Sequence, residues 1–290
     1  MTEHPLAKTL NAVASALERI APRKPSNPTL TDGDAYVWHP EAPELFPVEN
    51  VNRVPLSLLK GIDRQAKTLL ENTRQHANGY PANNVLLWGA RGTGKSSLIK
   101  AVHAVVNEDE LGNDNLVLVE IHREDIPTLP KLLYILRGAK RQCLLFCDDL
   151  SFEGDDDSYK ALKAVLEGGL EGRPPNVLFY ATSNRRHLMA RDMIENESET
   201  NIHRGETTEE KVSLSDRFGL WLGFHHIDQD TFLEIVEAYA EDLNIDIPVK
   251  ELRALATEWA LTRGARSGRV AWQFIQNQAG RLGITNKSSC

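Results

Sequence analysis

Residues 89–96 form the most specific chemical pattern in the chain. They read Gly-Ala-Arg-Gly-Thr-Gly-Lys-Ser, which is the G-x-x-x-x-G-K-[ST] spacing of a phosphate-binding loop. The apolar run 85–88 precedes the loop and a helical pattern over 97–102 follows it, so we expect a strand, a loop and a helix in that order. In that context backbone N–H groups converge on a phosphate at the N-terminus of a helix. The motif therefore predicts a nucleotide phosphate site.

The residue types in the loop suggest separate roles. Gly89, Gly92 and Gly94 permit positive φ angles and a close approach of the backbone to phosphate. Lys95 would reach the β- and γ-phosphates, and the hydroxyl of Ser96 would bind Mg²⁺. The nucleotide contacts predicted in this segment are Gly89, Ala90, Arg91, Gly92, Thr93, Gly94, Lys95, Ser96 and Ser97.

Two carboxylates end a second apolar run. Residues 143–147 lead directly into Asp148 and Asp149, as expected for a buried strand that delivers a carboxylate to the metal side of a phosphate loop. Asp148 would hold the Mg²⁺ shell through water. Asp149 stands where the carboxylate that activates water is usually a glutamate, and the missing methylene shortens its reach. Glu153 is the alternative water activator.

Four later polar residues complete the set of candidates. Asn184 follows the apolar run 176–182 and would orient the attacking water or contact the γ-phosphate. Arg217 lies between an acidic residue and an aromatic one. Arg266 and Arg269 flank a serine that is suited to cap the last helix, and either arginine can fold onto the phosphates.

The order of apolar runs predicts an α/β fold with a mainly parallel sheet. Four continuous runs, typical of strands buried on both faces, alternate with helix-sized stretches such as 128–138 and 158–170. The runs cover residues 85–88, 116–121, 143–147 and 176–182. After residue 228 only helical periodicity remains, over 229–243, 249–263 and 267–281.

These patterns divide the chain into three parts. Residues 1–50 hold an amphipathic helix over 4–20 and a proline-rich extended strap. Residues 51–226 form the predicted nucleotide-binding domain, and residues 227–290 form a small helical domain. The acidic segment 193–212 has no hydrophobic period and is expected to be a mobile loop.

The order of these motifs resembles that of the AAA+ ATPases, which have a three-layer αβα domain and a C-terminal helical lid. More narrowly, four strings are similar to the bacterial AAA+ family known as domain of unknown function 815, over about residues 50–285. The strings are 87–97 (LWGARGTGKSS), 146–153 (FCDDLSFE), 181–188 (ATSNRRHL) and 214–221 (LSDRFGLW).

The resemblance implies that ATP and Mg²⁺ are bound and that ATP is hydrolysed. It implies a sensor role for Asn184, an arginine finger at Arg217 that acts on a neighbouring subunit, and a lid sensor at Arg266 or Arg269. It also implies that Gly61 and Ile62 lie near the adenine. We favour Arg269 as the lid sensor, because it would point into the cleft from the first helical turn.

The segment after the second predicted strand departs from one AAA+ subgroup. Threading unfoldases usually carry an aromatic–apolar–glycine loop there, whereas residues 122–130 of this chain read HREDIPTLP. Because of this difference, we favour an adaptor, loader or switch role over polypeptide threading.

Composition narrows the remaining choices. A formal net charge of −8 argues against a broad basic surface, so nucleic acid binding is left open but is not indicated. Three cysteines give no disulfide framework, no apolar run approaches about 18 residues, and we expect a cytoplasmic protein without a membrane segment.

The leading hypothesis is an ATPase that forms a homo-oligomer, as a ring or an open ring, and acts on an unknown macromolecular partner. The alternative is a slow nucleotide-dependent switch or loader that binds a protein or DNA. A small-molecule kinase would leave the late arginines and the helical lid unexplained.

Overall fold

The computed structural model describes residues 30–31, 33–109, 116–152, 157–167, 172–185, 188 and 217–284. The predicted N-terminal helix over 4–20, the acidic segment 193–212 and Glu153 lie outside these residues. Within the described ranges, no helix is long and apolar enough to cross a membrane.

The centre of the fold is a seven-stranded sheet with the order β2-β1-β4-β5-β6-β3-β7. Every neighbouring pair is parallel except β1 and β2, which are antiparallel. The strands are β1 (Ala35–His39), β2 (Glu44–Pro47), β3 (Val85–Gly89), β4 (Leu116–Glu120), β5 (Gln142–Cys147), β6 (Val177–Ser183) and β7 (Leu220–Phe224). The prediction of an α/β fold with a mainly parallel sheet is confirmed.

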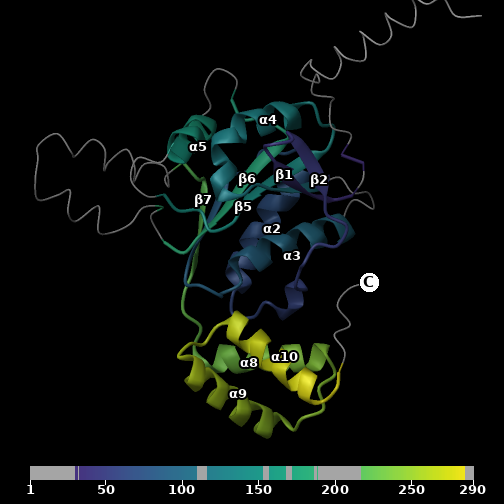
Figure 1. Cartoon of the computed structure of the whole chain (residues 1–290), viewed down its shortest axis with the longest axis vertical. Helices are drawn as coiled ribbons and strands as arrows, with labels where there is room; N and C mark the ends of the chain where they lie inside the picture. The colour runs from purple at the N-terminus through teal and green to yellow at the C-terminus, as the bar shows by residue number, and fades with distance from the viewer. Residues whose placement is uncertain are drawn as a thin grey trace, which may run out of the picture.

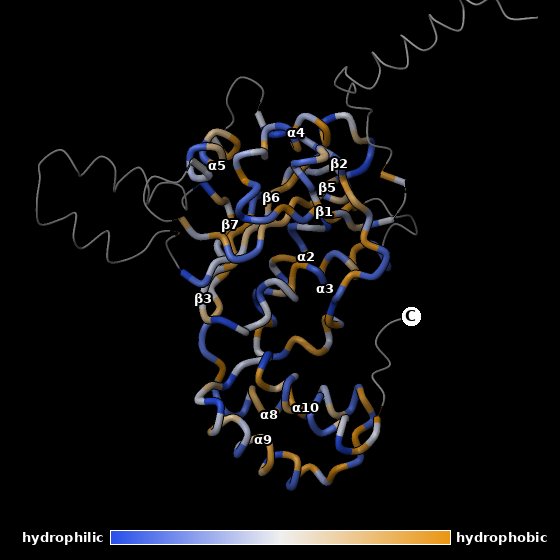
Figure 2. The backbone as a smooth tube through the Cα atoms, viewed as in Figure 1, coloured by the Kyte–Doolittle hydropathy of each residue, from blue (hydrophilic) through white to orange (hydrophobic). Residues whose placement is uncertain are grey.

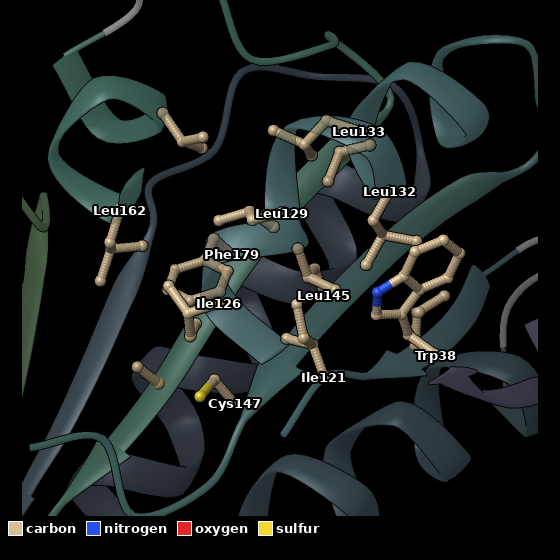
Figure 3. Packing of buried hydrophobic residues seen from close by; sticks show 14 of the residues in the cluster. Trp38, Ile121, Ile126, Leu129, Leu132, Leu133, Leu145, Cys147, Leu162 and Phe179 are labelled. Carbon is tan, nitrogen blue, oxygen red and sulfur yellow. The ribbon is translucent and has the colours of Figure 1, made fainter. Parts of the chain in front are cut away.

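Helices cover both faces of this sheet (Figure 1). Helices α2 and α3 pack on one face, and η2, α4 and α5 pack on the other. The 3-10 helices (η) and α-helices before the C-terminal helices are η1 (Leu56–Leu58), α2 (Asp63–Ala77), α3 (Lys95–Asp109), η2 (Arg123–Thr128), α4 (Leu129–Arg137) and α5 (Asp157–Glu167). Figure 3 shows the second of these layers, in which Leu129 and Leu132 lie over Leu145 and Phe179 of the sheet.

The middle strands are apolar throughout because both of their faces are buried. Along β5, Cys143, Leu145 and Cys147 belong to the core beneath α4 and α5, whereas Leu144 and Phe146 belong to the core beneath α2 and α3. All five side chains have no exposed surface. Figure 2 accordingly shows hydrophobic strands enclosed by helices of mixed hydropathy. Such burial explains why the central strands could be predicted from continuous apolar runs.

The sheet also contains strands that the sequence analysis did not predict. The proline-rich pattern predicts an extended strap over residues 35–47, but these residues form β1 and β2, and β1 pairs in parallel with β4. Trp38 anchors this edge, since its ring is completely buried and its Nε1 donates to Thr128 Oγ1 at 2.8 Å. The sheet therefore extends across the boundary predicted at residue 51. The last strand, β7, was also missed.

The three helices predicted at the C-terminal end are present as α8 (Gln229–Asp242), α9 (Val249–Arg263) and α10 (Gly268–Arg281). They enclose a hydrophobic cluster of their own and lie beyond one end of the sheet (Figure 1). Ser267 caps α10, because its side chain accepts from the N–H of Val270 at 3.2 Å. Val54 and Leu58, which precede α2, pack against this cluster and join it to the rest of the fold. Below, α8, α9 and α10 are called the helical lid.

Candidate functional site

The predicted phosphate loop connects β3 to α3, at the carboxyl end of the sheet. Gly89 has a φ of 130°, and a Cβ built on it would lie 1.9 Å from the carbonyl oxygen of Phe224. The N–H of Ala90 donates to that same oxygen at 3.1 Å. Close pairing with β7 thus requires glycine at the start of the loop.

The middle of the loop contacts the helical lid. Gly92 has a φ of 73°, its carbonyl oxygen accepts from the N–H of Gly268 at 2.9 Å, and a Cβ on Gly92 would lie 2.9 Å from Ser267 Oγ. Gly94, with a φ of 92°, faces Ile62. The loop is therefore held between the sheet on one side and the first turn of α10 on the other.

Lys95 is the first residue of α3 and is 7% exposed. Its Nζ donates to the carbonyl oxygens of Gly89 at 2.9 Å and Ala90 at 2.7 Å, and to Asn184 Oδ1 at 3.2 Å. Burial lowers the pKa of Lys95, and the nearby carboxylates of Asp148 and Asp149 raise it in part. The ammonium group is thus positioned by three oxygens and lies close to two acidic side chains.

A second group of contacts surrounds Asp148. The hydroxyls of Ser96 and Thr182 both donate to Asp148 Oδ1, each at 2.5 Å. The sequence predicted the first pair, Ser96 and Asp148, as the metal site, and the structure brings these two side chains together. Thr182 was not predicted. The polar end of the run 176–182 was visible in the sequence, but a threonine in a buried strand carries no signal of its own.

Asp149 and Asn184 form a third contact. Asn184 Nδ2 donates to Asp149 Oδ1 at 2.5 Å, while its Oδ1 accepts from Lys95. Asp149 has a φ of 50°, an uncommon conformation for a residue with a side chain. The amide of Asn184 therefore links the phosphate-loop lysine to the candidate water activator.

These groups lie at one end of a cleft of about 940 Å³ that extends to the helical lid. Its polar end includes Lys95, Ser96, Asp148, Asp149 and Asn184. Its other end has an apolar wall, which the sequence indicates only at Ile62, and Arg53, Lys60 and Asp242 also line the cleft. The wall is made by Leu58, Leu59, Ile62, Ile227, Ile235 and Trp272. A cleft with a polar end and an apolar end suits a ligand that joins phosphates to a flat base.

Of the two predicted adenine contacts, Ile62 lines this cleft, whereas Gly61 is not among the described residues that line it. Ile62 is 8% exposed. Gly61 has a φ of 73°, and a Cβ on it would lie 2.5 Å from Thr231 Cγ2 of α8. Gly61 thus allows the chain before α2 to approach the helical lid closely.

The three predicted arginines occupy different places. Arg269 lines both the cleft and an adjoining hollow of about 650 Å³, whereas Arg266 lines only the hollow. Arg91 lines both spaces. Arg217 precedes β7 and is not among the described residues that line the cleft. The structure therefore brings one arginine of the helical lid to the phosphate end of the cleft and leaves Arg217 outside it.

A phosphate loop at the carboxyl end of a parallel strand, in an αβα domain followed by a helical lid, defines a P-loop protein of the AAA+ type. A family model described as protein of unknown function (DUF815) matches residues 31–282, and the chain belongs to this family. No curated protein sequence matches the chain.

Similar solved structures include the RuvB Holliday junction branch migration motor of Thermotoga maritima. It is 13% identical, with a TM-score of 0.42 over 80% of this chain and 76% of that one. A variant of the same RuvB protein is also 13% identical, with a TM-score of 0.43 over 79% and 71%. Matches this distant carry no information about the activity of this chain.

Proposed function

We propose that this chain binds and hydrolyses ATP with Mg²⁺, assembles as a homo-oligomer, and couples hydrolysis to a conformational change that acts on a macromolecular partner. The observation that supports the proposal best is the convergence of Lys95, Ser96, Asp148 and Asn184 at one end of a cleft that reaches the helical lid. These residues come from three different strand ends, and no single local motif would bring them together.

The residues present fit Mg²⁺. The hydroxyl of Ser96 and the carboxylate of Asp148 are hard oxygen donors, and Mg²⁺ usually takes only one or two protein ligands beside water and substrate phosphates. Among the described residues there is no group of three or more His, Cys, Asp and Glu side chains that could hold a metal ion. The site therefore suits a cation that arrives with a nucleotide. When bound, Mg²⁺ would supply charge neutralisation to the phosphates.

In the proposed reaction the chain's own groups bind and orient. The loop N–H groups and Lys95 hold the phosphates, and the apolar wall near Ile62 holds the base. Asp149 orients the attacking water and accepts its proton, and Asn184 fixes the carboxylate of Asp149. Glu153 stays an alternative to Asp149.

The arginines would stabilise negative charge that develops on the phosphates. Arg269, which lines the cleft, would do so from the helical lid of the same subunit, with Arg266 as the alternative. We propose that Arg217 acts on the site of a neighbouring subunit, because it does not line the described cleft of its own subunit.

The test is phosphate release by the purified full-length chain, measured with and without Mg²⁺ and over a range of protein concentrations. We expect turnover of ATP that requires Mg²⁺ and that rises with the oligomer fraction determined by analytical ultracentrifugation. Full activity in a strictly monomeric protein would contradict the shared site. Absence of both ATP binding and turnover would overturn the proposed function.

The second candidate is a slow nucleotide-dependent switch or loader, again of AAA+ type. The short reach of Asp149 favours slow hydrolysis, and Arg263, Arg266 and Arg269 give the lid a local positive charge in an acidic chain. The basic segment Arg185-Arg186-His187 also supports this hypothesis; Arg185 is exposed, and the other two residues lie outside the described part of the chain. Turnover measured with and without DNA separates the two candidates, since stimulation by DNA would identify nucleic acid as a partner.

Two further expectations accompany the proposal. The cytoplasm is the proposed location. The division into an N-terminal part over 1–50, a nucleotide-binding part over 51–226 and a lid over 227–290 stays a prediction about independent units, although β1 and β2 already belong to the central sheet.

A further inference from the structure

Thr182 makes three hydrogen bonds to three consecutive residues at the end of β5. Its hydroxyl donates to Asp148 Oδ1 at 2.5 Å and accepts from the N–H of Asp149 at 2.9 Å. Its carbonyl oxygen accepts from the N–H of Leu150 at 2.7 Å. One residue of β6 thus fixes both the candidate metal carboxylate and the backbone of the candidate water activator.

The position of Thr182 explains why a side chain is needed there. The paired region of β5 and β6 ends at Cys147 and Ala181, so Thr182 is the first residue beyond it. Asp149 then turns away from the sheet with a φ of 50°. A hydroxyl can bond to the displaced N–H of Asp149, and it still has a proton to donate to Asp148. An apolar side chain of the same shape can do neither.

Thr182 is buried, and this affects how well its hydrogen bonds can be replaced. Thr182 is 1% exposed, so its hydroxyl is held in one place, whereas Asp148 is exposed and water that replaced the hydroxyl would not fix the carboxylate. Without that hydroxyl, Asp148 Oδ1 would keep only the bond from Ser96 among the described side chains, and Ser96 is the residue expected to turn toward Mg²⁺. The carboxylate of Asp148 would lose its fixed orientation when the metal binds.

We propose that Thr182 is a positioning residue, which acts through Asp148 to set Mg²⁺ affinity and through Asp149 to set the rate of hydrolysis. The proposal rests on the proposed function, because it concerns the same ATP site. Outer groups that orient a metal ligand typically change metal affinity or activity by about 10–100-fold when they are removed.

The test compares Thr182→Val, which removes the hydroxyl at nearly constant volume, with Thr182→Ser, which keeps it. Thr73→Val is the matched control, because Thr73 is also fully buried and its hydroxyl also makes two hydrogen bonds, to Leu69 and Tyr180, away from the site. The measurements are Mg²⁺ titrations of ATP turnover, ATP binding in the presence of EDTA, and thermal unfolding.

We expect Thr182→Val to raise the Mg²⁺ concentration for half-maximal turnover, and to lower the maximal rate, by about 10–100-fold. ATP binding in EDTA should be unchanged, and Thr182→Ser should recover most of the activity. Thr73→Val should lower only the unfolding temperature. In an Asp149→Asn background, which slows hydrolysis, Thr182→Val should still raise the Mg²⁺ requirement for ATP binding, because that effect passes through Asp148.

A Thr182→Val protein that resembles Thr73→Val, with lower thermal stability and an unchanged Mg²⁺ requirement, would overturn the positioning role. If Thr182→Val does not fold, Thr182→Ala removes the same hydroxyl with less bulk and is compared with Thr182→Ser in its place. Failure of the wild-type chain itself to hydrolyse ATP with Mg²⁺ is a separate outcome, which would overturn the proposed function and the role of Thr182 with it.

Discussion

Replacement of Lys95 by methionine isolates the charge of the phosphate loop from its packing. Methionine keeps most of the unbranched stem and removes the ammonium, which donates to Gly89, Ala90 and Asn184. We expect the variant to fold and to lose ATP turnover.

The structure gives a reason to expect little change in stability. Lys95 is 7% exposed and burial lowers its pKa, which means that folding disfavours the charged form of this side chain. One of the carbonyl oxygens that would lose a donor, that of Ala90, also accepts from Thr93 Oγ1 at 2.8 Å. A change in unfolding free energy near 1 kcal/mol would move the unfolding temperature by only about 2–4 °C in a protein of this size class.

The effect on the reaction should be far larger. Removal of one hydrogen-bond donor that faces the charge developing in a transition state typically lowers the rate by about 10²–10³-fold, or roughly 3–4 kcal/mol. Phosphate release and equilibrium binding of a fluorescent ATP analogue would be measured on the same preparation. Lys67→Met is the matched control, because Lys67 is an exposed lysine of α2 that does not line the cleft. A well-folded Lys95→Met protein with wild-type turnover would refute the phosphate-site assignment.

Three other results are expected. The Arg217→Ala variant should bind ATP and hydrolyse it poorly. Mixing it with the Lys95→Met variant should restore activity at interfaces where the intact ATP site of the first variant meets the intact Arg217 of the second. Mixed oligomers that show no recovery of activity would contradict action between subunits. Burial lowers the pKa of both His76 and His103 from 6.5 to about 4. Between pH 6.5 and pH 4 the unfolded chain therefore binds more protons than the folded chain. As the pH is lowered through this range, the unfolding free energy measured by urea titration should fall by on the order of 3 kcal/mol per histidine. The substitution His103→Asn should make this fall smaller. Gly89→Ala should be severely destabilising, since its Cβ would lie 1.9 Å from a carbonyl oxygen of β7; a soluble variant with wild-type unfolding temperature would show that this contact is easily relieved.

The central strands could be predicted from sequence because of where they lie in the sheet. A strand between two others, with helices on both faces, must be apolar at every position, as β5 is. The strands that were missed lie toward the edges. In β2 only Leu45 is partly buried, and the other three residues are exposed. β7 contains Gly223, which packs against the ring of Trp88. β2 lacks the continuous apolar run that reveals a strand in a sequence. β1 has such a run at 35–38, but the prolines that follow at positions 40, 43 and 47 favour an extended strap, and glycine interrupts the apolar run of β7.

Some residues of the candidate site could be predicted from sequence and others could not. Lys95 and Ser96 follow from a motif of eight consecutive residues, and Asp148 follows from its place after an apolar run. The role of Thr182 depends on a contact between residues 34 positions apart in the chain. Trp272 joins the cleft only because the helical lid folds back toward the sheet. Contacts of this kind depend on tertiary structure, so a local pattern in one sequence cannot indicate them.

The two arginines that the sequence left as alternatives differ because of a helix cap. Ser267 is the N-cap of α10, so Arg266 precedes the helix and Arg269 belongs to its first turn. Ser267 also packs against Gly92, and the next residue, Gly268, donates its N–H to the carbonyl oxygen of Gly92. The start of α10 is therefore attached to the middle of the phosphate loop.

This attachment bears on how a bound nucleotide would move the lid. A shift of Gly92 toward phosphate has to carry Gly268 with it or break their hydrogen bond, and Arg269 is the next residue along the helix. The helical lid has its own hydrophobic cluster, so its three helices can respond as one body. Away from the phosphate loop, Gly61 packs against Thr231 of α8, and Val54 and Leu58 pack against the lid cluster, so the lid has further points of contact. Under the proposed function, the contact at the phosphate loop would couple the lid to a bound nucleotide, and we expect the lid to change position when ATP binds.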